Sequence, residues 1–252
     1  MFGRDKVARL VAEFLGTGIL TLVVLSVQRS TIGVPYFVAL AAGLAVALLF
    51  FVFSSVSGAH FNPALTIGLW TARKVQTLQA VLYIVVQLLG AWLAYYLYTY
   101  FVANPLQPIG GHFSGRVLVA EAVGTAIFSF AFAAVVYQRF TEGVRASVAG
   151  VAFALSMIVA AAASIGLINP ALALGTRAWN FAGSMGWNTY VLGPVLGAII
   201  GVNLYALLFA PAGQSVFASV KVGKPATVAA TASKPAVSAR KATSKKKTAK
   251  KK

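Results

Sequence analysis

Six long apolar segments dominate the sequence and limit the folds that it can adopt. They lie near residues 7–27, 36–55, 76–103, 115–137, 144–164 and 188–210. A helix needs about 20 apolar residues to cross a bilayer, and each segment has about that length. The pattern predicts an all-α membrane protein with six transmembrane helices. We interpret the first segment as a retained span rather than a signal peptide, because it carries Glu13 and no small-residue cleavage site follows it.

Two shorter apolar segments remain, at 62–71 and 169–179. At about 1.5 Å of rise per residue, a helix of this length covers roughly half of the hydrocarbon thickness of a bilayer. Such a helix cannot span the membrane alone, and its connecting loop cannot face lipid, which offers the backbone no hydrogen-bond partners. We therefore expect two re-entrant half-helices enclosed by the six spans.

The composition separates a membrane domain from a basic tail. Hydrophobic residues make up 59% of the chain and charged residues 10%, whereas a soluble domain carries about 25% charged residues. Of the 21 Lys and Arg residues, 11 lie from Lys221 onward. We predict a channel domain over 1–210, with halves at about 7–103 and 115–210, and a disordered Lys-rich tail over 211–252. The tail is expected to be a solvated charge run or to contact anionic lipid, and not to bind a specific nucleic acid.

The distribution of basic residues predicts the orientation in the membrane. An even number of spans leaves both termini on one side. If that side is the cytoplasm, the inner segments hold 18 Lys and Arg residues, which are seven in the channel domain and 11 in the tail, and the outer segments hold three. The positive-inside rule then predicts an integral, multi-pass membrane protein with cytoplasmic N- and C-termini.

The second half of the chain repeats the first. Asn62-Pro63-Ala64-Leu65 recurs as Asn169-Pro170-Ala171-Leu172, at an offset of 107 residues (169 − 62). Glycines recur at the same offset, as in Gly43 and Gly150, and a Glu-x-x-Gly-Thr segment begins at both Glu13 and Glu121, at an offset of 108 (121 − 13). Because each half contains three spans, the second half enters the membrane from the opposite side. The repeats are therefore predicted to be inverted, so that the two half-helices meet near the middle of the bilayer.

The paired Asn-Pro-Ala motifs open the two half-helices. Asn is a strong N-cap, because its side-chain oxygen accepts a free backbone N–H of the first turn, and proline is favoured at the next position. Capping leaves the Asn amide NH2 free to point into a lumen. Each half-helix also directs the positive end of its dipole to the same point. The arrangement predicts a pore centre at Asn62 and Asn169 that accepts neutral hydrogen-bonding solutes and opposes ions and protons.

These motifs give the chain a resemblance to the aquaporin, or major intrinsic protein, family over about residues 7–210. The resemblance implies a homotetramer with one pore in each subunit, passive transport of water or another small neutral solute, and neither a cofactor nor enzyme activity. No metal site is expected. The segments that carry the resemblance are Ser57-Gly58-Ala59-His60-Phe61-Asn62-Pro63-Ala64, the second Asn-Pro-Ala motif, the two Glu-x-x-Gly-Thr segments, Gln87-x-x-Gly90-Ala91 and Gly193-Pro194-x-x-Gly197-Ala198.

The resemblance also implies an outer constriction, at which this chain departs from the family. By position relative to the motifs, the four members are Ala42, Met157, Gly166 and Leu172. The family usually has arginine where this chain has Leu172. The filter therefore lacks a fixed charge, an aromatic ring and a side-chain donor. Arg177 lies more than a helical turn further on and is not a substitute by position.

Three polar residues accompany the motifs. Glu13 and Glu121 are carboxylates inside spans, where ionisable side chains are usually functional or paired. We interpret them as structural groups that accept N–H bonds from the two re-entrant loops, as the resemblance implies, with a proton relay as the alternative. His60 is expected to face the inner vestibule with a satisfied hydrogen bond, and a pH-sensitive gate is the alternative.

The sequence thus predicts a passive channel for water or small neutral polar solutes. Short outer connections and Ala173, where glycerol channels carry aspartate, favour water. The missing arginine opposes strict water selectivity, so glycerol or ammonia-like solutes remain an alternative. A secondary transporter is a further alternative, because inverted repeats with broken helices also occur there, as is a tethering protein whose basic tail is its active part.

Overall fold

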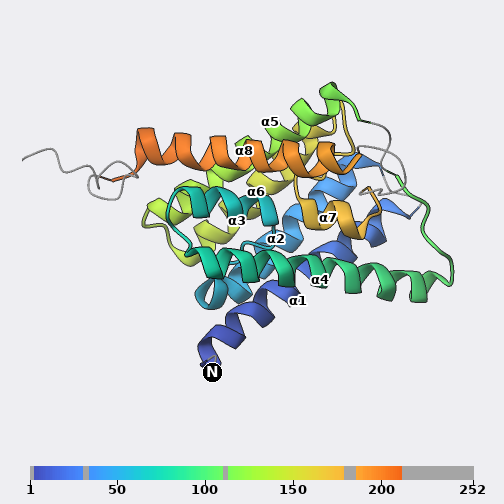
Figure 1. The fold of residues 1–252 in the computed structure, drawn as a ribbon, viewed down its shortest axis with the longest axis horizontal. Coiled ribbons are helices and arrows are strands. Elements are labelled where there is room, and N and C mark those ends of the chain that lie inside the picture. The colour runs from blue at the N-terminus through green and yellow to red at the C-terminus, as the bar shows by residue number, and fades with distance from the viewer. Residues whose placement is uncertain (1–2, 31–33, 110–112, 179–185, 212–252) are drawn as a thin grey trace, which may run out of the picture. The chain divides into compact units, whose positions relative to one another are not determined.

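The computed structural model describes residues 3–30, 34–109, 113–178 and 186–211, and these residues form eight helices (Figure 1). Six of them are long and apolar enough to cross a membrane. The other two, α3 and α7, are short and begin at the Asn-Pro-Ala motifs. In chain order the helices are α1 (Arg4–Gln28), α2 (Pro35–Ser57), α3 (Pro63–Thr71), α4 (Thr77–Val102), α5 (Gly115–Tyr137), α6 (Glu142–Ala160), α7 (Pro170–Gly175) and α8 (Gly186–Phe209).

The helix boundaries agree with the predicted spans except near the second motif. α5 has the predicted bounds, but α6 ends at Ala160 rather than near 164. α7 ends at Gly175 rather than near 179, and Arg177 follows in a left-handed conformation with φ of 66°. A helix cannot continue through a left-handed residue, which explains the shorter α7. The tail predicted over 211–252 lies, after residue 211, outside the described residues.

The helix contacts repeat between the two halves. α1 packs against α4 and α2, and in the second half α5 packs against α8 and α6. Each half-helix crosses to the other half, because α3 packs against α8 while α7 packs against α4. Figure 1 shows α3 and α7 one after the other among the long helices, and the two also contact each other. This exchange is the inverted 3+3 arrangement that the internal repeat predicts.

Close helix packing depends on glycines at the crossings. A Cβ atom added to Gly43 would lie 2.7 Å from the carbonyl oxygen of Gly150, and one added to Gly150 would lie 2.4 Å from that of Gly43. The backbones of α2 and α6 therefore approach each other directly. Gly193, Gly197 and Gly201 of α8 pack in the same way against carbonyl groups of α5, as expected for small residues between membrane helices.

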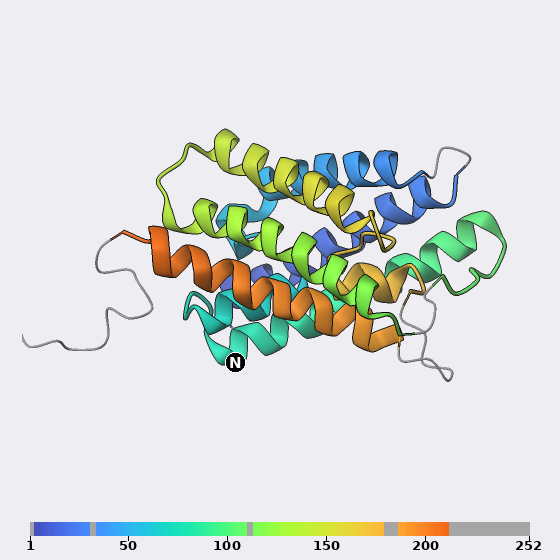
Figure 2. The ribbon, with the colours of Figure 1, turned by 90° about the horizontal axis from the view of Figure 1, so that it is seen from above.

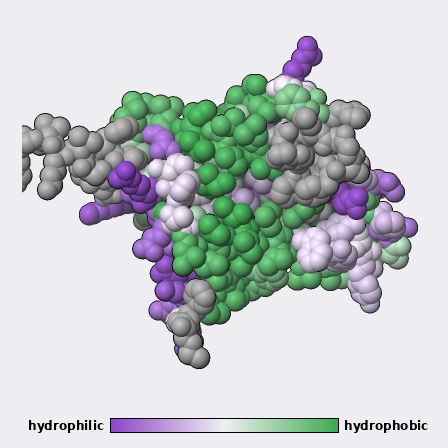
Figure 3. Space-filling view, in the orientation of Figure 1, coloured by the Kyte–Doolittle hydropathy of each residue, from purple (hydrophilic) through white to green (hydrophobic). Residues whose placement is uncertain are grey.

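The surface has the distribution expected of a membrane protein. Hydrophobic residues cover the middle of the face in Figure 3, and hydrophilic residues gather toward its two sides. Leu44 and Leu48, on α2, are 74% and 64% exposed. Such exposure of apolar side chains is unfavourable in water but not in lipid. The N-terminal end of α1 and the C-terminal end of α8 lie toward the same side of the helix assembly (Figures 1 and 2).

Candidate pore and its supporting residues

Asparagine side chains cap both half-helices. The Oδ1 atom of Asn62 accepts hydrogen bonds from the backbone N–H groups of Ala64 (2.9 Å) and Leu65 (3.4 Å). In α7 the Oδ1 atom of Asn169 accepts from Ala171 N–H at 2.9 Å. Both asparagines have extended backbones and a proline follows each. Local chemistry thus starts each half-helix in the same way, with its N–H groups and positive dipole end directed toward the motif.

The two asparagines also join the halves to each other. The Nδ2 atom of Asn62 donates to the carbonyl oxygen of Ile168 at 3.0 Å, and that of Asn169 donates to the carbonyl oxygen of Phe61 at 2.9 Å. Each acceptor precedes the opposite motif. An amide has two N–H hydrogens, so each asparagine keeps a second donor that has no protein acceptor among the described residues. The exchange fixes the direction of both amides.

A buried glutamate holds the first re-entrant loop. Glu13 is fully buried, and its Oε1 atom accepts from the Ser57 hydroxyl (2.6 Å) and the His60 N–H (3.0 Å). Its Oε2 atom accepts from the Phe61 N–H and from the Gln87 side chain, both at 2.8 Å. Four donors converge on one carboxylate, which offsets much of the cost of burying it. Hydrogen bonds to Glu13 therefore anchor the loop to α1 just before Asn62.

The second loop has an equivalent support. Glu121, also fully buried, accepts from the Ser164 hydroxyl (2.6 Å) and the Leu167 N–H (3.0 Å) through Oε1. Its Oε2 atom accepts from the Ile168 N–H at 2.6 Å. These contacts place both carboxylates against the loops, and no Lys or Arg side chain among the described residues bonds to either. They support the structural interpretation over a proton relay.

Sequence reasoning did not identify the remaining members of this network. Ser57 and Ser164 are 107 residues apart (164 − 57), which is the offset of the repeat. Aligning the two halves could therefore have identified them as equivalent residues. Gln87 belongs to a motif that carried the family resemblance, but nothing in the sequence predicted its bond to Glu13. In the second half Pro194 takes the equivalent position (87 + 107), inside α8, and proline has no side-chain donor.

A cavity of about 230 Å³ opens beside the first loop. His60 lines it, and His60 Nδ1 lies 3.2 Å from the hydroxyl of Thr66. The cavity wall also contains two cations. The Nζ atom of Lys74 is 3.9 Å from the centroid of the Tyr137 ring, and the guanidinium carbon of Arg145 is 5.4 Å from that of Phe50. The other lining residues are Ser57, Gly58, Leu69, Val75, Gln79, Phe132, Val135 and Val136.

The cavity is therefore electropositive. Burial lowers the pKa of Lys74, whereas the ring face of Tyr137 favours its cationic form. None of the lining residues is an aspartate or a glutamate. Fixed positive charge of this kind opposes the entry of small cations and leaves neutral solutes unaffected.

The four residues predicted to form the outer constriction are small or apolar. Ala42, Met157 and Leu172 are each at most 2% exposed. Gly166 has φ of 66°, and an added Cβ would lie 2.5 Å from the carbonyl oxygen of Met157. Gly166 N–H donates to the Ser164 hydroxyl at 2.7 Å. Glycine at this position thus follows from backbone geometry.

Arg177 is held by other groups. Its Nη1 atom donates to the Tyr95 hydroxyl at 3.2 Å, and its guanidinium carbon lies 5.7 Å from the centroid of the same ring. Arg29 donates nearby to the carbonyl oxygens of Gln107 and Thr176. These contacts tie the ends of α1, α4 and α7 together. They give Arg177 a structural partner on α4.

The fold and this site define a class of protein: a six-span membrane channel with inverted halves and a paired half-helix centre. Residues 4–205 match the model of the major intrinsic protein family. The chain is 30% identical to aquaporin AqpM of Methanothermobacter marburgensis over 237 residues, which cover 79% of this chain and 96% of that protein. It is 31% identical to aquaporin Z of Photorhabdus laumondii over 229 residues, covering 80% and 97%.

A solved structure agrees with this assignment. The aquaglyceroporin of Plasmodium falciparum matches with a TM-score of 0.67 and 25% identity, over 79% of this chain and 95% of that one. The chain belongs to the major intrinsic protein family. It is an integral membrane channel for water or small neutral solutes, and its transport is passive rather than enzymatic.

Proposed function

We propose that this channel conducts water together with small neutral polar solutes through one pore per subunit. The proposed path runs from the vestibule beside His60, past Asn62 and Asn169, to the neck at Ala42, Met157, Gly166 and Leu172. The exchanged hydrogen bonds between the two motifs carry the proposal, because they leave one directed amide donor on each asparagine.

Ion exclusion would follow from the same centre. The N-termini of α3 and α7 together present roughly one positive charge equivalent where the motifs meet. A permeating water whose oxygen accepts from both amides is oriented with its hydrogens away from them. This orientation interrupts the file of hydrogen-bonded water molecules along which protons could pass. A cation would lose its hydration against this positive field.

The neck is proposed to set the choice among neutral solutes. With Leu172 in place of arginine, it offers permeants no charged donor, so discrimination rests on size and on apolar contact. Such a site separates solutes less sharply than one built on hydrogen bonds. We therefore expect measurable passage of glycerol or ammonia-like solutes beside water, rather than strict water selectivity.

We further propose the organisation of the whole protein. The channel domain covers 1–210, its two halves about 7–103 and 115–210, and residues 211–252 form a basic tail. The excess of basic residues on the side of the termini supports a cytoplasmic location for both. The exposed apolar residues of α2, α5 and α6 are compatible with a homotetramer in lipid.

Stopped-flow light scattering of proteoliposomes tests the function. Vesicles that contain the protein should shrink faster than empty vesicles under an impermeant osmolyte and re-swell faster in glycerol. The matched control is the Asn62→Ala/Asn169→Ala variant at equal protein density, which should lose proton exclusion measured with an internal pH dye. Rates equal to those of empty vesicles for water, glycerol and ammonia would refute the proposal.

A further inference from the structure

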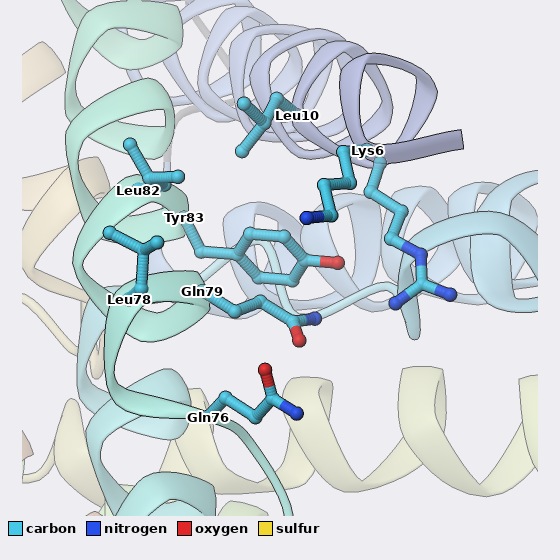
Figure 4. A pocket seen from close by; sticks show the side chains of 8 residues that line it. Lys6, Leu10, Gln76, Leu78, Gln79, Leu82 and Tyr83 are labelled. Carbon is cyan, nitrogen blue, oxygen red and sulfur yellow. The ribbon is translucent and has the colours of Figure 1, made fainter. Parts of the chain in front are cut away.

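A second cavity lies between the N-terminal ends of α1 and α4, and it shares Gln79 with the cavity beside His60. Its volume is about 130 Å³. The side chains that line it are of three kinds (Figure 4): cations, hydrogen-bonding groups and leucines. They are, in that order, Lys6 and Arg9; Gln76, Gln79 and Tyr83; and Leu10, Leu78 and Leu82.

The polar part of the cavity is suited to an anion. Lys6 and Arg9 are three residues apart on α1 and therefore share one face of that helix. Figure 4 shows the Lys6 side chain extending toward the Tyr83 hydroxyl, and Arg9 also lines the cavity. Within the described residues, neither cation has an ion-pair or hydrogen-bond partner, and none of the lining residues is a carboxylate.

The apolar part is suited to an acyl chain. Leu78 is 66% exposed, and Leu10 and Leu82 are partly exposed beside it. Leu78 lies in the first turn of α4, and Leu10 and Leu82 lie between one and two turns into α1 and α4, next to the apolar surface that we expect lipid to cover. A free phosphate ion would use the cations but would gain nothing from three leucines. An amphiphile with an anionic head uses both parts of the cavity.

We propose that this cavity binds an anionic phospholipid, with its phosphate between Lys6 and Arg9 and the start of an acyl chain on Leu10, Leu78 and Leu82. Basic pockets between spans at the inner side of a membrane are suited to such headgroups. The amides of Gln76 and Gln79 supply further donors to the phosphate and glycerol oxygens. The proposal does not depend on which solute the pore conducts.

Bound lipid would support the first re-entrant loop. The Tyr83 hydroxyl donates to the carbonyl oxygen of Ser57 at 2.8 Å, and the Tyr83 ring packs edge-on against His60 with centroids 5.4 Å apart. Tyr83 thus lies between the cavity and the loop that leads to Asn62. A ligand that binds the folded state at this position raises its stability by mass action.

The test compares lipid binding of the full-length protein with that of a charge-matched pair of variants. Purified protein is titrated in detergent with phosphatidylglycerol or phosphatidylcholine, and bound lipids are resolved by native mass spectrometry. The test variant is Lys6→Gln/Arg9→Gln. The control variant is Arg4→Gln/Arg139→Gln, which removes the same charge from residues that do not line the cavity. Both variants retain the basic tail and its background affinity.

For the tightest phosphatidylglycerol site we expect about thirtyfold weaker binding in the test variant, equivalent to about 2 kcal/mol, and less than a threefold change in the control. Phosphatidylcholine should lack this site in every form, and millimolar inorganic phosphate should not displace the lipid. Equal losses in both variants, equal binding of the two lipids, or displacement by phosphate would each overturn the proposal. Water flux of the variants reports whether they are folded.

Discussion

At the scale of single residues, Leu172 and Glu121 show two different consequences of burial. Leu172 fills a position at which, by the family resemblance, arginine is usual, so we expect it to affect selectivity. Glu121 is a buried carboxyl group toward which three donors point, so we expect it to affect folding. Each of the two makes a separate prediction.

Replacing Leu172 by arginine should restore a charged donor to the neck. We expect the Leu172→Arg variant to raise the ratio of water to glycerol permeability by roughly tenfold, because hydrogen-bond donors and a narrower opening discriminate better than apolar contact. The Leu172→Met variant keeps an apolar side chain of similar volume and should leave the ratio unchanged. Stopped-flow measurements with both osmolytes give the ratio, and an unchanged value in Leu172→Arg would place the neck elsewhere.

Neutralising Glu121 should weaken the second re-entrant loop. In Glu121→Gln one acceptor oxygen becomes an NH2 group that faces a backbone or hydroxyl donor, and a lost bond to a charged acceptor costs about 1.5–3 kcal/mol. We expect a lower unfolding temperature and lower water permeability. Glu142→Gln, at the exposed start of α6, is the control and should change neither. A proton relay would predict instead that stability is kept while proton-coupled flux changes.

At the scale of helices, the crossing of α2 and α6 places the predicted neck residues. Ala42 is next to Gly43, which contacts Gly150 and Ala154 on α6, and Met157 follows one turn later. If Ala42 and Met157 face each other as proposed, the distance between the two backbones sets the space between them. A small change in the packing of α2 against α6 should therefore change the width of the neck.

Adding one methyl group at this crossing tests that view. In Gly150→Ala the new Cβ would lie 2.4 Å from the Gly43 carbonyl oxygen, so α2 and α6 must separate at a cost of about 1–3 kcal/mol. We expect a lower unfolding temperature and a changed water-to-glycerol ratio. Gly143→Ala adds the same group to α6 where nothing lies within 4 Å, and it should be neutral or slightly stabilising. Equal behaviour of the two variants would contradict the argument.

At the scale of the whole molecule, positive charge is distributed unequally along the proposed path. The neck carries no charged side chain, the centre carries two helix N-termini, and the vestibule contains Lys74 and Arg145. We therefore expect cation exclusion to be strongest on the side of the termini. In a typical family member, as the resemblance implies, an arginine would add a barrier at the other end.

Removing the vestibule cations should weaken this barrier without closing the pore. Methionine keeps apolar contact with the rings of Tyr137 and Phe50, so Lys74→Met/Arg145→Met should fold and retain water flux. We expect its thallium influx, followed with a dye inside proteoliposomes, to exceed that of the wild type severalfold. Arg139→Met removes a charge from outside the vestibule lining and should have no effect. If thallium influx is unchanged in the double variant, the two Asn-Pro-Ala motifs alone exclude cations.

The sequence alone determined the six spans, the two half-helices, the inverted repeat and the caps at Asn62 and Asn169, because apolar length and capping are local properties. It also indicated the carboxylates Glu13 and Glu121 as loop supports. The tertiary structure decided which groups meet across the halves. The bond from Asn62 to the Ile168 carbonyl joins residues 106 positions apart, and the cavity of Lys6 and Arg9 needs α4 beside α1. No local pattern encodes such contacts, because they exist only once helices from distant segments have packed.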